Sequence, residues 1–162
     1  MASNAPETTA GSAPALISNT PVPVLMLRGS AALSPFRQAR LMSRLRAALP
    51  LIETVYAEYR HFAALTQELS APELGVLERL LTYGPKLESH APQGDLLLVI
   101  PRLGTISPWS TKATDIAQHC ALKKVRRLER GVAWFVRKRD GAALTPEERR
   151  QVAALVHDRM TE

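Results

Sequence analysis

Apolar residues recur with two different periods along this chain, and the change from one period to the other predicts its secondary structure. Alternating or continuous apolar runs predict four strands, at 24–27, 52–65, 96–100 and 125–136. Spacings of three or four residues predict helices that begin near Pro35, Pro72 and Pro108, each just after a serine that can cap the helix. Strands and helices therefore alternate along the chain.

The same spacings predict which side chains face the core. The first helix carries an apolar stripe of Phe36, Ala39, Met42, Leu45 and Leu49. Alternation in 52–65 places Val55, Ala57, Tyr59 and His61 on one face, and alternation in 125–136 does so for Leu128, Arg130, Val132, Trp134 and Val136. A lone histidine such as His61 is typical of a hydrogen-bonded sheet residue.

The order of elements predicts an α+β fold. Two strand-helix-strand units, each expected as a right-handed crossover, form a sheet of about four main strands with helices packed on one side. The capping box at 145–148 predicts one further, C-terminal helix, whose apolar stripe of Val152, Leu155, Val156 and Met160 we expect to be unmatched. This pattern divides the chain into a disordered tail (1–23), a domain (24–139) and the start of a linker region with one helix (140–162).

Composition limits the class of protein. The 162 residues suit one domain with appendages, and 21 Lys+Arg against 15 Asp+Glu give a formal charge of +6. That charge suits nucleic acid, phosphorylated partners or acidic surfaces of other domains. A chain with no long apolar run and no secretory signal is expected in the cytoplasm. The single cysteine, Cys120, excludes an internal disulfide, and we expect it to be buried on the apolar side of its helix.

The stretch 101–122 joins the strongest strand pattern to a helix through a polar connection. Ser107 followed by Pro108 forms an N-cap signature, and Ser110 or Thr111 offers a second start for the helix. Such a connection either carries function or is an ordinary loop whose Trp109 fills the core. His90, in the preceding loop, either reaches a partner or a bound anion or is simply exposed.

The letters of this stretch carry a family resemblance. GTISPWSTKATDIA, at 104–117, resembles the amino-terminal domain of phosphoribosylformylglycinamidine synthase, the large single-chain amidotransferase of purine biosynthesis. Further matching stretches follow the same order, at 27–37, 55–65, 77–85, 89–102 and 125–136. The resemblance covers roughly 25–139. It implies a fold like a dimer of the family's small separate subunit, fused into one polypeptide.

The resemblance implies chemistry that lies mostly outside this chain. The parent enzyme is implied to be an ATP-dependent carbon-nitrogen ligase that takes ammonia from glutamine, with ATP and magnesium as cofactors. Its glutaminase site is implied to lie in a carboxy-terminal domain. This chain has no P-loop, no glycine-rich nucleotide fingerprint, no zinc pattern and no paired carboxylates. We therefore predict no catalytic, cofactor-binding or metal-binding residues here.

The resulting prediction is a structural docking domain for the synthetase and glutaminase domains of the same parent chain, which aligns them for ammonia transfer. Trp109 is the expected anchor of the contact at 104–116. The expected polar or substrate-proximal contacts are Thr105, Ser107, Ser110, Lys112, Thr114, Asp115 and His90. Two alternatives are a free-standing assembly subunit and a basic nucleic-acid-binding module. Aromatic residues make up only 5% of the chain, which disfavours the latter.

Overall fold

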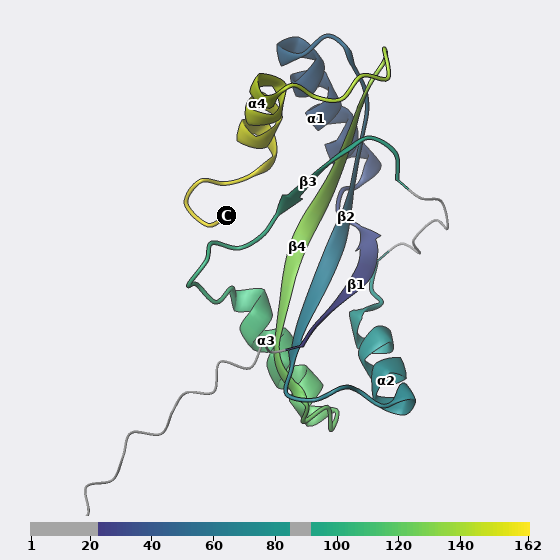
Figure 1. Cartoon of the computed structure of the whole chain (residues 1–162), viewed down its shortest axis with the longest axis vertical. Helices are drawn as coiled ribbons and strands as arrows, with labels where there is room; N and C mark the ends of the chain where they lie inside the picture. The colour runs from purple at the N-terminus through teal and green to yellow at the C-terminus, as the bar shows by residue number, and fades with distance from the viewer. Residues whose placement is uncertain (1–22, 85–91) are drawn as a thin grey trace, which may run out of the picture.

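The computed structural model describes residues 23–84 and 92–162, so the predicted disordered tail, apart from Pro23, and His90 lie outside the described residues. The described residues form the following elements: β1 (Val24–Ala31), α1 (Pro35–Ala48), β2 (Ile52–Leu65), α2 (Ala71–Leu81), β3 (Asp95–Val99), α3 (Pro108–His119), β4 (Val125–Lys138) and α4 (Pro146–Val156). The predicted α+β fold, with a sheet of four strands and a C-terminal helix, is confirmed (Figure 1).

The sheet is antiparallel, with strand order β1-β2-β4-β3. The long strands β2 and β4 lie together in the centre, and the shorter β1 and β3 each pair with one half of a central strand (Figure 1). The order reads the same from either half of the chain, as expected for two similar units. The predicted right-handed crossovers are wrong, because the strands within each unit are antiparallel neighbours, a pairing that needs no crossover.

All four helices cover one face of the sheet, as predicted, but they do so in two separate pairs. At one end α1 and α4 pack on the first half of β2 and the second half of β4. This first core includes Leu45, Val55, Val136 and Val152. At the other end α2 and α3 cover a second core, which includes Leu77. Each pair takes one helix from each half of the chain. The middle of this face lies between the two cores (Figure 1).

Local sequence signals explain where the helices begin. Ser34, Ser70, Ser107 and Thr145 are the N-caps, and each side chain accepts a hydrogen bond from a backbone N–H three residues on. Ser70 and Thr145 form complete capping boxes with a glutamate three residues on. The cap at Ser107 selects the first of the two predicted starts for α3.

Three local expectations are wrong. The first strand continues past Arg28 and Gly29 to Ala31. Gly29 does not end the strand; it lies against the ring of His61, where a Cβ would clash. Phe36, which the predicted stripe places in the core, is 76% exposed. Leu41 is buried in the core instead. Cys120 is exposed because it is the C-cap residue of α3, where the helical face no longer meets the sheet.

The stripe of the last helix is matched rather than unmatched. Val152 is fully buried in the core beside α1, and Leu155 and Val156 pack against the same core. Met160 lies beyond the helix and is exposed. The assignment of 140–162 to a linker region stays a prediction, although its helix packs on the domain.

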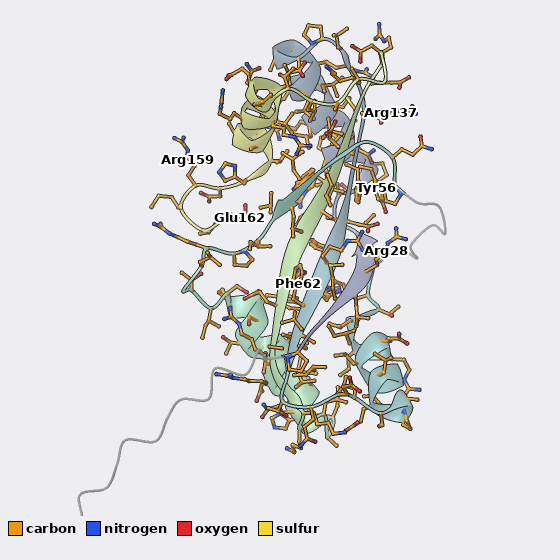
Figure 2. All side chains as sticks on the ribbon, in the orientation of Figure 1. Arg28, Tyr56, Phe62, Arg137, Arg159 and Glu162 are labelled. Carbon is orange, nitrogen blue, oxygen red and sulfur yellow. The ribbon has the colours of Figure 1, made fainter. Side chains whose placement is uncertain are left out.

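None of the helices in the described residues packs on the other face of the sheet. At its centre the buried carboxylate of Glu58 accepts two hydrogen bonds from Arg28, at 2.9 and 2.7 Å, and contacts Arg60 at 2.5 Å. Around it, exposed apolar side chains line the two edge strands: Val24, Met26, Leu96 and Leu98. Figure 2 labels Arg28 on β1 and Tyr56 and Phe62 on β2. This face is therefore apolar at its edges and ionic in its middle.

Candidate functional site

An aromatic and cationic cluster fills the middle of the helix-covered face, between the two cores. It consists of Tyr59 and His61 from β2, Arg130 from β4, Tyr83 from the segment after α2, and Trp109 from the first turn of α3. Because His61 and Arg130 are cross-strand partners, the sheet register places them side by side. We call these five residues the Arg130 cluster.

The guanidinium of Arg130 is held between rings. Its Cζ lies 4.3 Å from the centre of the Tyr59 ring and 5.0 Å from that of Trp109. Its Nη1 donates to the hydroxyl of Tyr83 at 3.2 Å. The indole of Trp109 also stacks on His61, with ring centres 5.6 Å apart. The arginine is thus fixed in place by rings and a phenol rather than by a carboxylate.

The Tyr83 hydroxyl lies between Arg130 and His61 and contacts both. Tyr83 Oη accepts from Arg130 and lies 2.7 Å from Nε2 of His61, so its own proton is free to go to that nitrogen. Burial, and then the charge of Arg130, lower the pKa of His61 to about 4. His61 is therefore neutral at physiological pH, and its buried Nδ1 has no hydrogen-bond partner among the described residues.

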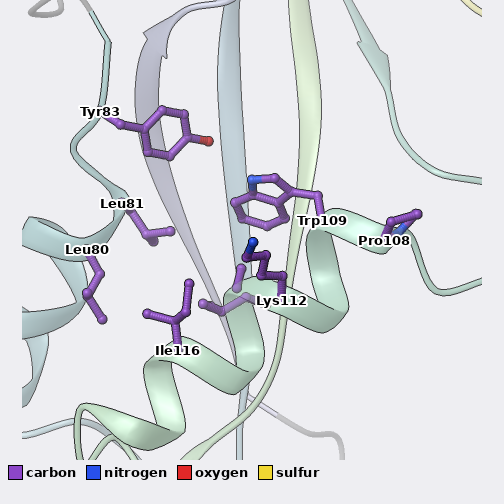
Figure 3. A pocket seen from close by; sticks show the side chains of 9 residues that line it. Leu80, Leu81, Tyr83, Pro108, Trp109, Lys112 and Ile116 are labelled. Carbon is purple, nitrogen blue, oxygen red and sulfur yellow. The ribbon is translucent and has the colours of Figure 1, made fainter.

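Two cavities lie on either side of Trp109. An apolar one of about 460 Å³ lies between α2 and α3, and Leu80, Tyr83, Lys112 and Ile116 line it (Figure 3). In Figure 3 the Tyr83 hydroxyl points toward the Trp109 side of this cavity. A second cavity, of about 360 Å³, is lined by Tyr59, Arg130 and the start of α3. The indole therefore separates an apolar space from a cationic one.

Three hydroxyls among the predicted site residues hold α3 in place. Ser107 caps the helix and donates to Glu129 Oε1 at 2.8 Å. Ser110 is buried and donates to the carbonyl of Leu128, while Thr114 Oγ1 accepts from the Leu128 N–H at 2.9 Å. Ser110 and Thr114 thereby occupy backbone groups of β4 where β3 no longer runs beside it. Any contact of these hydroxyls with a partner stays a prediction.

The other predicted residues lie at the surface. Thr105 stabilises its own loop, as its hydroxyl donates to the Arg102 carbonyl at 2.6 Å. Lys112 is exposed and makes no ion pair with any described residue. The carboxylate of Asp115 is exposed, 3.5 Å from His119 Nδ1. The structure thus brings Trp109 and Lys112 together at one cavity, with Asp115 further along the helix.

Sequence reasoning missed the most exposed apolar residues of this region and most of the cluster. Leu103 and Ile106, in the connection before α3, are 87% and 65% exposed. Tyr83 could not be found, because its loop meets the sheet only in the fold. The signal for Arg130 was present, since alternation placed an arginine on an apolar strand face. That observation alone would have singled it out.

Across 23–84 and 92–162, no three His, Cys, Asp or Glu side chains come together to hold a metal ion. None of the helices in those ranges combines the length and apolarity needed to cross a bilayer. What the site presents is an indole, exposed aliphatic side chains and two cations.

A comparison with protein families identifies the family of the chain. The family model described as formylglycinamide ribonucleotide amidotransferase N-terminal matches residues 58–162. The match begins in the middle of β2 and includes every member of the Arg130 cluster. Since it spans more than half of the chain, the chain belongs to the family of N-terminal domains of formylglycinamide ribonucleotide amidotransferase, an enzyme of purine biosynthesis.

Proposed function

We propose that this domain is a non-catalytic docking platform, which holds the synthetase and glutaminase domains of its parent enzyme in register for ammonia transfer. The surface that carries the contact comprises Leu103, Ile106, Trp109, Lys112 and Ile116. The family match supports this proposal, because an N-terminal domain has further domains of the same chain as natural neighbours. ATP and magnesium would bind to those domains.

The observation that carries the proposal is the exposure of large aliphatic side chains around the signature helix. Leu103, Ile106 and Ile116 are 87%, 65% and 45% exposed, and all lie on α3 or its leading connection. Leu103 lines a cavity on the open face of the sheet, and Ile116 lines the apolar cavity between α2 and α3. Exposed apolar side chains of this kind are typical of protein interfaces. Trp109 borders the cavity between α2 and α3 and suits the role of a buried aromatic anchor. Lys112 adds a cation at its edge.

The test uses the complete enzyme with Trp109→Ala and Lys112→Ala combined. Product formation is measured twice, once with glutamine and once with free ammonia as the nitrogen source. Loss of an interface anchor should lower the glutamine-dependent rate roughly tenfold, since such anchors contribute more than about 1.4 kcal/mol. The ammonia-dependent rate, which needs no transfer between domains, should change far less.

Matched controls are available on the same domain. Phe36 is an exposed aromatic residue on α1, whereas Trp109 is half-buried, and Lys123 is an exposed lysine beyond α3. The double variant Phe36→Ala, Lys123→Ala should leave both rates unchanged. Equal rates for the Trp109/Lys112 variant and this control, with normal association of the domains, would refute the docking role.

The nucleic-acid alternative finds less support. On the open sheet face, where such modules bind, Arg28 and Arg60 contact Glu58, and Arg127 contacts Glu129. Arginines paired in this way offer little charge to a phosphate backbone. The exposed side chains at the sheet edges are aliphatic rather than aromatic stacking surfaces.

A further inference from the structure

Arg130 differs from the other partly buried arginines on the central strands β2 and β4 in having no acidic partner among the described residues. Arg60, Arg127 and Arg137 each lie within 2.8 Å of a glutamate oxygen. For Arg130 the described partners are the two rings and the Tyr83 hydroxyl. A partly buried guanidinium with one hydrogen bond costs free energy unless a further group accepts hydrogen bonds from it. Its Nε and Nη2 are thus free to donate.

The space in front of Arg130 has the size and lining of a small binding site. The cavity of about 360 Å³ is walled largely by apolar groups, among them Tyr59, Trp109 and Val132. Glu162, on the C-terminal tail, also lines it, but its carboxylate accepts from the Asp158 N–H at 2.8 Å (Figure 2). No ion pair joins it to Arg130 among the described contacts. The guanidinium therefore faces the cavity with no carboxylate bound to it among the described residues, and Glu162 places one negative charge at the opposite wall.

We propose that this cavity is a carboxylate-binding site, in which Arg130 receives the ligand's two oxygens and Tyr59 and Trp109 contact its apolar body. A guanidinium presents parallel N–H donors that match a carboxylate. One positive charge balances a monoanion, whereas a phosphate dianion would leave a charge uncompensated between apolar walls. The rings hold the guanidinium in its plane before the ligand arrives, so little conformational entropy is lost on binding.

The natural source of the carboxylate is an Asp or Glu side chain on the surface that docks here. This part of the inference rests on the proposed docking function, because the cavity adjoins Trp109. Charge complementarity supports it, since the chain carries a formal charge of +6. The carboxylate-binding site itself is tested with a small molecule. A failure of this inference is then distinguishable from a failure of the proposed docking function.

The probe is phenylacetate, compared with phenylacetamide, which has the same shape and no charge. Both are titrated into the unmodified 162-residue chain, and binding is followed by NMR at the Arg130 Nε–H and the two indole N–H groups. We expect phenylacetate to shift Arg130 and Trp109 saturably and to leave Trp134, which does not line the cavity, unchanged. Equal shifts with the amide, or none at Arg130, would overturn the proposal.

Two variants and one further anion sharpen the result. Arg130→Gln should weaken phenylacetate binding at least about tenfold, because a charge-assisted pair is lost. Glu162→Gln, at the opposite wall, should tighten it about two- to threefold by removing a competing charge. Unchanged affinity in Arg130→Gln contradicts the assignment. Inorganic phosphate that binds more tightly than phenylacetate contradicts the choice of a carboxylate.

Discussion

At the scale of single residues, His61 couples the stability of the domain to pH. Its pKa is lowered to about 4 in the fold, against about 6.5 in an unfolded chain, so the unfolded state binds more protons between these values. Stability is fully present above about pH 6.5 and is lost as the pH falls toward 4. We expect His61 to account for about 3 kcal/mol of the loss between pH 7 and pH 4. Urea unfolding at a series of pH values measures it.

A variant separates this histidine from the carboxylates that titrate nearby. His61→Gln keeps a hydrogen-bonding group toward Tyr83 and cannot be protonated in this range. The pKa of Glu73 is lowered to about 2 by its bonds to Lys124 and Ser70, so most of its effect comes at lower pH. Identical pH profiles for the variant and the unmodified chain would show that His61 does not control the transition.

Also at this scale, Glu58 neutralises the open face of the sheet. Its carboxylate is fully buried and contacts Arg28 and Arg60, so Glu58→Gln leaves two cations without their shared partner. We expect a loss of about 3 kcal/mol in the free energy of unfolding, as for other buried pairs that lose one member. Chemical denaturation measures it. Glu147→Gln is the control, because that residue forms only an exposed pair with Arg150.

At the scale of elements, the contact between α3 and β4 depends on two hydroxyls that serve one residue. Ser110→Ala removes the donor to the Leu128 carbonyl, and Thr114→Val removes the acceptor of its N–H without changing shape. Each variant leaves a backbone group unsatisfied, and we expect each to cost about 1 to 3 kcal/mol. In Thr114→Val the Leu128 amide should exchange with solvent faster.

Thr111→Ala is the natural comparison for this pair. It removes a hydroxyl from the same helix, but one that is exposed and 3.4 Å from the Ser107 carbonyl. Its unfolding free energy and the exchange of Leu128 should match those of the unmodified chain. If Thr111→Ala and Ser110→Ala were equally destabilised, the hydroxyl contacts to β4 would contribute nothing specific.

The elements themselves were largely predictable, because their signals are local. A serine before Pro108 fixed the start of α3, and alternation fixed β2 from Ile52 to Leu65 as the structure has it. The direction of strand pairing was not predictable, since the apolar pattern of β1 is the same in either orientation. Nor could the Arg130 cluster be assembled, because Tyr83 meets His61 only through the packing of α2 against the sheet.

At the scale of the whole molecule, two cores share one pair of long strands. The strand β2 gives Val55 and Ala57 to the core under α1 and α4, and Ala63 and Leu65 to the core under α2 and α3. Both cores depend on the same β2–β4 pairing. Unfolding of the strands at one core would therefore break hydrogen bonds that also support the other core. The domain should therefore unfold as one cooperative unit, although its helices form two groups.

Each core contains a tryptophan that reports on it, which makes this cooperativity measurable. Trp134 is buried in the first core, and Trp109 packs against the second. Leu45→Ala, in the first core, and Leu77→Ala, in the second, should each cost about 2 to 5 kcal/mol, because both side chains are fully buried. Each variant should lower the urea midpoint equally at both indole N–H resonances. A shift confined to the tryptophan of the altered core would mean that the two ends unfold independently, and the strands would then not transmit stability between the docking surface and the far helices.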